Sequence, residues 1–231
     1  MIIICLVFEV FMSFYEIIKN YQSLDFETEF SKVTENKILS ILDKEYISEI
    51  DFLHLLSPIA KNFLENIAQK AYLTTRKHFG KAVQLFSPLY ISNFCENNCS
   101  YCGYRKDSDI QRKKLSFEEI ETEAKEIYKT GIRQILILTG ESRIISPFEY
   151  ILESVKILKK YFPMIGIEVY ALHDFEYKLL NEAGANYLTI YQETYLENYY
   201  KQYHTVGPKK DYNFRIEDRK STRLNSSHTI Q

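Results

Sequence analysis

The sequence is poor in glycine, proline and cysteine, and it carries no excess of either charge. Its 231 residues include 7 glycines and 5 prolines, and because no glycine precedes Gly80 we expect a helix-rich first part and a turn-rich middle. The 29 basic residues against 31 acidic ones leave a net charge of −2, without the basic surplus on which nucleic-acid binding rests. With 45% hydrophobic residues the chain suits one well-buried α/β domain, and a disordered or collagen-like chain is excluded.

Long apolar runs are also lacking, even at the start of the chain. Residues 1–8 are apolar, but Glu9 interrupts them, and they lack the basic region and the small-residue cleavage site of a signal peptide. The run is too short to cross a bilayer, so we expect no membrane segment. Helical periodicity with interspersed charges starts only at Met12, which makes residues 1–11 a doubtful upstream extension.

The other end of the chain, residues 218–231, is polar and aperiodic. Its first eleven residues agree with the in-frame translation of a common sequencing adapter, so we predict that this tail does not derive from the protein's own gene. The remaining sequence divides at Gly80 into an N-terminal helical region, residues 12–80, and a second region, residues 81–217.

Residues 12–80 repeat apolar side chains three and four positions apart, which places them on one face of each of several helices. Ser57-Pro58 separates two of these helices, with serine at a capping position and proline at the first helical position. We expect this region to have a structural role.

Beyond Gly80, strands alternate with helices. Four apolar strands are expected at residues 83–92, 134–139, 165–171 and 187–191. Helices are expected from the capping box at Ser116 to Gly131, and over residues 147–161 and 174–183. This alternation predicts a parallel sheet of βα units, in which the chemistry lies at the carboxyl ends of the strands.

Three of the four cysteines follow the first expected strand. Cys95, Cys99 and Cys102 have Cys-x3-Cys-x2-Cys spacing, while Cys5 stands alone. A structural zinc site closes with four ligands, and the crowding disfavours incidental thiols or a disulfide. Three thiolates on a [4Fe-4S] cluster leave one iron open to a substrate or cofactor. The motif therefore favours an iron–sulfur cluster with an open iron.

The string Cys95-Glu-Asn-Asn-Cys99-Ser-Tyr-Cys102-Gly103 resembles the signature of the radical S-adenosylmethionine (radical SAM) superfamily. Further segments are similar to the tyrosine lyases of that superfamily, and the likeness covers residues 13–217; these segments are residues 87–93, 138–143, 191–195, 204–209 and 211–215. The resemblance implies an α/β fold, a radical SAM (β/α)8 TIM-type barrel truncated to about its first four βα units, behind an N-terminal helical region. It also implies a [4Fe-4S] cluster held by Cys95, Cys99 and Cys102, with S-adenosyl-L-methionine on the fourth iron.

Two branches of these lyases compete. Residues 139–143 and 167–170 favour 2-iminoacetate synthase of thiamine biosynthesis, which cleaves the Cα–Cβ bond of L-tyrosine to 2-iminoacetate (dehydroglycine) and 4-cresol. Gly103-Tyr104 mildly suggests the [FeFe]-hydrogenase maturase, which makes carbon monoxide and cyanide from tyrosine. A third reading is an inactive truncated iron–sulfur fragment, because half a barrel leaves strand edges and apolar surface uncovered. We expect low or no activity from this chain in isolation.

The resemblance also implies which residues bind the cofactor. Tyr101, before the last cysteine of the triad, is expected near the adenine. Gly140 and Glu141 match the superfamily's Gly-Gly-Glu element, except that Thr139 replaces the first glycine, and Glu141 can accept a hydrogen bond from the ammonium of S-adenosyl-L-methionine. Glu168 alternates with buried strand neighbours and is expected to face the barrel interior, with solvent as the alternative.

Substrate binding is assigned to residues near the end of the likeness. Glu193 and Tyr195 are placed to hold the ammonium or the phenol of tyrosine, and Arg215 can pair with its carboxylate. His173 and His204 are expected in exposed loops and receive no role. The implied partners are reduced flavodoxin or ferredoxin and thiazole synthase, with no nucleic acid and no membrane, and the oxygen-labile cluster implies a cytoplasmic location.

Overall fold

The computed structural model describes residues 14–216. Cys5, the extension at residues 1–11 and the adapter-like tail at residues 218–231 lie outside the described residues. No helix between residues 14 and 216 is both long enough and apolar enough to cross a membrane.

The chain forms two compact units. A helical unit runs from Lys19 to Val83, and a second unit joins residues 14–18 with residues 84–216. The division lies close to the boundary expected at Gly80. Residues 14–18, expected in the helical region, instead belong to the second unit.

Helices alone build the described part of the helical unit, and three of them have polar side-chain caps. The helices are α2 (Phe26–Ser31), α3 (Glu35–Leu42), α4 (Glu49–Leu55), the 3-10 helix η1 (Pro58–Phe63) and α5 (Leu64–Phe79), preceded by α1 (Phe14–Tyr21) at the boundary between the units. Asp25, Thr34 and Ser48 cap α2, α3 and α4, because each side chain accepts a hydrogen bond from a backbone N–H of the first turn. Ile38 of α3 is fully buried in a small core that belongs to this unit alone.

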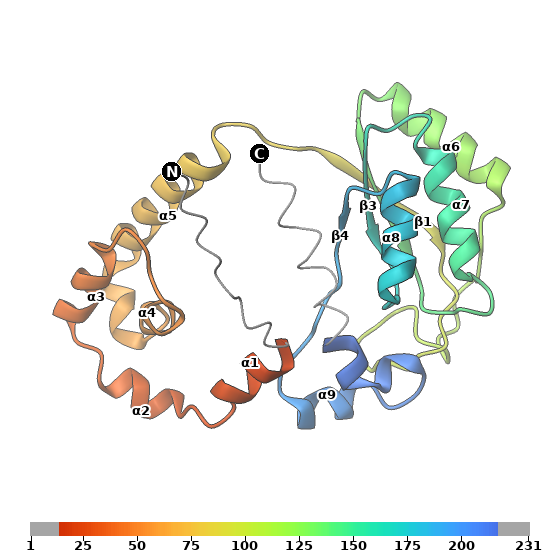
Figure 1. The fold of residues 1–231 in the computed structure, drawn as a ribbon. Coiled ribbons are helices and arrows are strands. Elements are labelled where there is room, and N and C mark those ends of the chain that lie inside the picture. Colours follow the sequence, from red (N-terminus) through yellow and green to blue (C-terminus); the bar gives the residue numbers. More distant parts are fainter. Residues whose placement is uncertain (1–13, 217–231) are drawn as a thin grey trace, which may run out of the picture. The chain divides into compact units, whose positions relative to one another are not determined.

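The second unit is centred on a parallel sheet, as the sequence predicts (Figure 1). Its strands are β1 (Phe86–Ser92), β2 (Gln134–Thr139), β3 (Met164–Glu168) and β4 (Tyr187–Leu188), and its crossover helices are α6 (Phe117–Lys129), α7 (Phe148–Leu158) and α8 (Asp174–Ala183). The strands pair in the order β1-β2-β3-β4, all parallel. Because right-handed crossovers between consecutive strands return to the same face, this order is that of a (β/α) barrel and not of a doubly wound sheet.

The main hydrophobic core lies between the sheet and these helices. Ile135 and Ile137 of β2 are fully buried, and Ile120 of α6 and Ile151 of α7 belong to the same cluster. Alternation along the strands leaves the opposite face of the sheet free for other contacts. Leu138, at the end of β2, lines a cavity there.

Three of the strands are shorter than expected, among them β3, which ends at Glu168 and not at residue 171. β1 starts at Phe86, and Val83, expected inside it, is 82% exposed. β4 consists of two residues, because only Tyr187 and Leu188 pair with β3. In the sequence, the apolar pattern extends beyond the residues that pair with a neighbouring strand. It therefore predicts strands that are longer than the paired segments.

A helix that the sequence analysis missed, α9 (Glu197–Tyr203), follows β4. Its Tyr200 is fully buried beside Tyr212 and Ile216, and residues Tyr15 and Ile18 of the same unit pack against them. After α9 the chain returns to the loop that follows β1. This return, completed by the 3-10 helix η2 (Pro208–Lys210), brings residues far apart in sequence into one site.

Candidate cluster and ligand site

A cavity of about 270 Å³ opens at the carboxyl ends of the strands, where the βα alternation predicts the chemistry. Its walls come from the loop after β1, the ends of β2 and β3, and the segments after β4 and α9. Nine of the ten predicted site residues line it: Cys95, Cys99, Cys102, Tyr101, Gly140, Glu141, Glu168, Glu193 and Arg215. Glu168 therefore faces the cavity, which was the preferred of its two expected orientations.

Residues 95–103, the cysteine loop, carry three free thiols toward this cavity. Cys99 is only 5% exposed, while Cys95 and Cys102 are half-buried. The Asn97 side-chain amide lies 3.6 Å from the Cys95 sulfur, and the Tyr104 backbone N–H donates to the Cys102 sulfur at 3.4 Å. Burial raises the pKa of the Cys99 thiol above its ordinary value.

The loop fits a cluster better than a single ion. Among the described residues no group of three His, Cys, Asp or Glu side chains is arranged to hold one metal ion. In a [4Fe-4S] cluster each thiolate binds a different iron, so the sulfurs need a shared cavity and not a single coordination centre. The three thiols have that cavity, and among the described residues no fourth cysteine lines it.

Gly140 and Glu141 connect the end of β2 to the cysteine loop. A side chain on Gly140 would place its Cβ 2.8 Å from the carbonyl carbon of Phe94, so only glycine allows this approach. The Glu96 N–H donates to the backbone oxygen of Glu141 at 2.8 Å. The Glu141 carboxylate accepts from the Asn97 amide at 2.8 Å, and it lies in the cavity wall.

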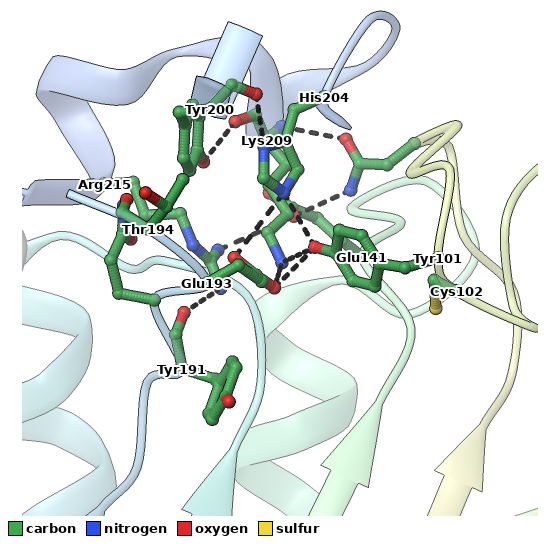
Figure 2. Close-up of polar contacts among 12 residues, drawn as sticks. Tyr101, Cys102, Glu141, Tyr191, Glu193, Thr194, Tyr200, His204, Lys209 and Arg215 are labelled. Carbon is green, nitrogen blue, oxygen red and sulfur yellow. Dashed lines mark hydrogen bonds and ion pairs between the residues drawn. The ribbon is translucent and has the colours of Figure 1, made fainter. Parts of the chain in front are cut away.

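Glu193 is the centre of a second set of polar contacts (Figure 2). Its Oε1 accepts hydrogen bonds from the Tyr101 hydroxyl at 2.5 Å and from the Lys209 ammonium. The Lys209 ammonium also donates to the Tyr101 oxygen at 3.0 Å, and the His204 ring lies 2.7 Å from that oxygen. Burial raises the pKa of Glu193, but the bonds from His204, Lys209 and Tyr101 outweigh it and hold the pKa below its usual range. Glu193 is therefore a half-buried carboxylate in its ionised form.

Arg215 has spare hydrogen-bonding capacity. Its side chain is buried and donates to the Tyr191 carbonyl at 3.3 Å, with Glu141 at 3.8 Å. Three buried polar atoms of cavity-lining residues have no hydrogen-bond partner among the described residues: Arg215 Nε, Glu193 Oε2 and Thr139 Oγ1. Because an unsatisfied buried polar atom costs about 1–3 kcal/mol, such atoms around a cavity point to a polar ligand.

Some residues lie elsewhere than predicted. Tyr195 is 38% exposed and is not part of the cavity wall, because the chain turns away after Glu193 and the Tyr195 carbonyl accepts from Tyr212. His204, expected in an exposed loop, is 1% exposed.

Sequence reasoning assigned no role to Asn97, His204 or Lys209, although all three contact predicted site residues. Asn97 lies between two cluster cysteines and is 2% exposed. Lys209 and His204 belong to the segment 204–209, whose likeness to the tyrosine lyases was the available signal.

Comparison with known proteins supports the cluster and cofactor interpretation. The model of the radical SAM superfamily matches residues 89–217, more than half of the chain. The chain belongs to the radical SAM superfamily. Membership implies a [4Fe-4S] cluster and S-adenosyl-L-methionine, and it confirms both the predicted family and the predicted barrel type.

Individual relatives include members of both expected branches. The chain is 37% identical to 2-iminoacetate synthase from Salmonella typhimurium, and 36% identical to that from Escherichia coli, over 176 residues in each case. These alignments cover 76% of this chain and 47% of each relative. The crystal structure of HydG, a maturase of the [FeFe]-hydrogenase, matches with a TM-score of 0.83 and 28% identity, over 91% of this chain and 48% of that one. The chain thus spans about half the length of the relatives that it matches.

Proposed function

We propose that this chain is part of a radical lyase. The lyase cleaves the Cα–Cβ bond of free L-tyrosine to 2-iminoacetate and 4-cresol for thiazole and thiamine biosynthesis. The observation that carries the proposal is the 37% identity to 2-iminoacetate synthase, together with three free thiols in a cavity that also presents unsatisfied charged groups. Tyrosine and S-adenosyl-L-methionine each bring an α-ammonium and an α-carboxylate. A cavity lined by glutamates and by Arg215 and Lys209 is suited to such zwitterions.

Cys95, Cys99 and Cys102 are the proposed cluster ligands. When bound there, the cluster and S-adenosyl-L-methionine supply the 5′-deoxyadenosyl radical that starts the reaction by taking hydrogen from tyrosine. The chain's own contribution is to bind, orient and exclude water. Burial of Cys99 serves the last purpose, since only 5% of its surface is exposed.

The charged residues divide between the cofactor and the substrate. Glu141 is proposed to accept from the ammonium of S-adenosyl-L-methionine, with Gly140 giving the backbone its close approach, while Glu168 lies in the same wall. Glu193 is proposed to hold the tyrosine ammonium with its Oε2, which lies 3.5 Å from His204 Nε2 and has no hydrogen-bond partner among the described residues. Arg215, with an unpaired Nε, is proposed to pair with the tyrosine carboxylate.

Tyr101 lines the cavity with its hydroxyl anchored by Glu193 and Lys209. These bonds fix the ring beside the cysteine loop and are compatible with a ring that packs on the adenine. Tyr195 keeps only a supporting role in this proposal, because it lies outside the cavity wall.

The likeness to HydG favours a second candidate, a tyrosine lyase of [FeFe]-hydrogenase maturation that forms carbon monoxide and cyanide. Both candidates need a low-potential electron donor, for which we propose reduced flavodoxin or ferredoxin in the cytoplasm. They differ in the fate of the product, which thiazole synthase consumes in the thiamine branch.

Anaerobic reconstitution with iron and sulfide, followed by an assay of products from tyrosine, tests the proposal. The lyase forms 4-cresol together with glyoxylate, the hydrolysis product of 2-iminoacetate, and the Cys99→Ser variant forms neither. Carbon monoxide and cyanide among the products would replace the thiamine assignment with hydrogenase maturation. A brown, S-adenosyl-L-methionine-binding chain that forms no 4-cresol would instead support the inactive-fragment reading, since the chain spans 47% of its relatives.

A further inference from the structure

The segment after α9 pairs with the cysteine loop along its backbone. The Asn98 N–H donates to the Val206 carbonyl at 3.2 Å, and the Ser100 N–H donates to the Tyr203 carbonyl at 3.1 Å. Between these two bonds, Cys99 and His204 form an antiparallel bridge. We call residues 203–209 the strap. The strap thus pairs with the backbone on both sides of Cys99, the middle cysteine of the loop.

Gly207 allows the strap to lie directly on the loop. Its φ is +90°, a left-handed conformation that favours glycine. A Cβ on Gly207 would lie 2.7 Å from both the Asn97 Cα and the Glu96 carbonyl oxygen. Two residues later, the Lys209 N–H donates to the Asn97 side-chain oxygen at 2.8 Å. Glycine at position 207 therefore allows the backbones of the strap and the cysteine loop to come this close.

His204 connects the strap to a side chain of the cysteine loop. One ring nitrogen, Nδ1, lies 2.8 Å from the Tyr200 carbonyl, which can only accept, so Nδ1 carries a hydrogen. The other, Nε2, is hydrogen-bonded to the Tyr101 hydroxyl at 2.7 Å (Figure 2). Tyr101 stands between Cys99 and Cys102, so His204 fixes the loop relative to α9.

From these contacts we propose that the strap is a positioning device for the cysteine loop, with His204 and Gly207 as its positioning residues. The strap keeps Cys99 buried and directed at the cavity before any cluster binds. A loop that is already ordered loses less conformational freedom on taking up its ligand, which favours cluster assembly. The inference deepens the proposed function, since it rests on the assignment of the three cysteines as cluster ligands.

The sharpest test replaces Gly207 and uses Gly131 as a matched control. Gly131 has a φ of +93°, close to that of Gly207, but a Cβ there would meet nothing within 4 Å. Gly207→Ala and Gly131→Ala therefore introduce similar backbone strain, and only the first pushes the strap off the cysteine loop. Both variants are made in the full chain, without iron, under anaerobic reducing conditions.

The readout is the rate at which iodoacetamide alkylates Cys99, with hydrogen exchange of amides 97–100 measured in parallel. Cys99 can react only when the loop opens, because it is 5% exposed. We expect Gly207→Ala to accelerate both rates at least tenfold, and Gly131→Ala to leave them within twofold of the unaltered chain. Exchange of the buried β2 amides at Ile135 and Ile137 reports global unfolding and is expected to change little in either variant.

His204 gives an independent test. His204→Phe keeps a buried ring but removes both hydrogen bonds, and we expect Cys99 alkylation to rise about tenfold. His204→Gln restores a polar partner for Tyr101 and should recover part of the protection. The iron bound after reconstitution is expected to follow the same order, highest in the unaltered chain and lowest in His204→Phe.

The proposal is overturned if Gly207→Ala and Gly131→Ala behave alike, or if Cys99 becomes reactive only in step with the β2 amides. These measurements use the chain without its cluster. A chain that forms no 4-cresol can therefore still show strap-dependent protection of Cys99, which separates failure of this inference from failure of the tyrosine-lyase proposal.

Discussion

Two arginine–glutamate pairs lie near the same edge of the sheet, and they differ in how many of their hydrogen-bonding groups have a partner. Arg143 donates to both carboxylate oxygens of Glu176, at 2.9 and 3.1 Å, and to the Ala171 carbonyl at 3.1 Å. Arg215 lies 3.8 Å from Glu141, and its Nε has no partner within residues 14–216. We call the first pair closed, because its charged groups bond to each other. We call the second pair open, because Arg215 keeps an unbonded group in a residue that lines the cavity.

The surroundings of the two pairs explain the difference. Glu176 also accepts the His173 backbone N–H at 2.7 Å, which completes the capping box of α8, and the Arg143 guanidinium stacks over Tyr170. That pair therefore stabilises the start of a helix. Arg215 has no comparable set of partners although it is 7% exposed, so its position costs stability unless a ligand binds. A closed pair indicates structure, whereas an open one indicates a binding site.

Replacing Arg215 is expected to have the largest effect. Arg215→Met removes the charge and keeps the aliphatic stem, so the dissociation constant for tyrosine should rise about a hundredfold, equivalent to about 2.7 kcal/mol. Tyramine, which lacks the carboxylate, should bind the variant and the unaltered protein equally. Thermal stability should not fall, because a buried unpaired group is lost. A weakening confined to S-adenosyl-L-methionine would move Arg215 from the substrate to the cofactor.

Breaking the closed pair should show the opposite pattern. Glu176→Gln removes the charge that holds Arg143, and since Glu176 is buried while Arg143 is 42% exposed, we expect a loss of about 2 kcal/mol in unfolding free energy. Urea unfolding measures this loss. The affinity for tyrosine should stay within twofold, and a tenfold loss of affinity without a loss of stability would contradict the division into closed and open pairs.

Lys209 and Lys210 test the open site with adjacent residues of the same type. Lys209 bonds to Glu193 and is largely buried, whereas Lys210 is exposed. Lys209→Met should weaken tyrosine binding about tenfold, or about 1.4 kcal/mol, because Glu193 loses its cation. Lys210→Met serves as the control and should change binding less than twofold. Equal effects of the two variants would exclude a specific role for Lys209.

The closed pair should also give stability a pH dependence. Although burial raises the pKa of Glu176, the hydrogen bonds from Arg143 and His173 lower it below the ordinary value of 4.5. A lowered folded-state pKa stabilises the fold fully above pH 4.5, and this stabilisation is lost as the pH falls below it. The loss is at most about 1.4 kcal/mol per pH unit from this group. When urea unfolding is measured between pH 5 and pH 3.5, the free energy of unfolding should fall less steeply with decreasing pH in Glu176→Gln than in the unaltered chain.

Residues at strand ends were the predictable part of the site. The βα alternation places Cys95, Glu141 and Glu193 after parallel strands, and parallel strands end at one edge of a sheet. For Glu168, strand alternation left two orientations open, and the cavity lining shows the preferred one, toward the interior. The observed strand order β1-β2-β3-β4 agrees with the barrel type that the resemblance implies.

The contacts made by α9 and the strap could not be read from the sequence. His204 and Lys209 meet Tyr101 across 103 and 108 positions, and no local pattern specifies such pairings. The position of Tyr195 outside the cavity wall also depends on tertiary structure, since its carbonyl accepts from Tyr212, 17 residues later. The local motif around Arg143 was visible, but its closed pairing with Glu176 depends on tertiary structure.

The most direct test of the central claim, an open-iron cluster on Cys95, Cys99 and Cys102, is electron paramagnetic resonance of the reconstituted, reduced chain with and without S-adenosyl-L-methionine. The account predicts about four irons per chain and a reduced-cluster signal that shifts when S-adenosyl-L-methionine is added, because one iron lacks a protein thiolate. Both the iron content and the shift should be lost in Cys99→Ser. A signal that does not respond to S-adenosyl-L-methionine, or a cluster that persists unchanged in Cys99→Ser, would contradict the account.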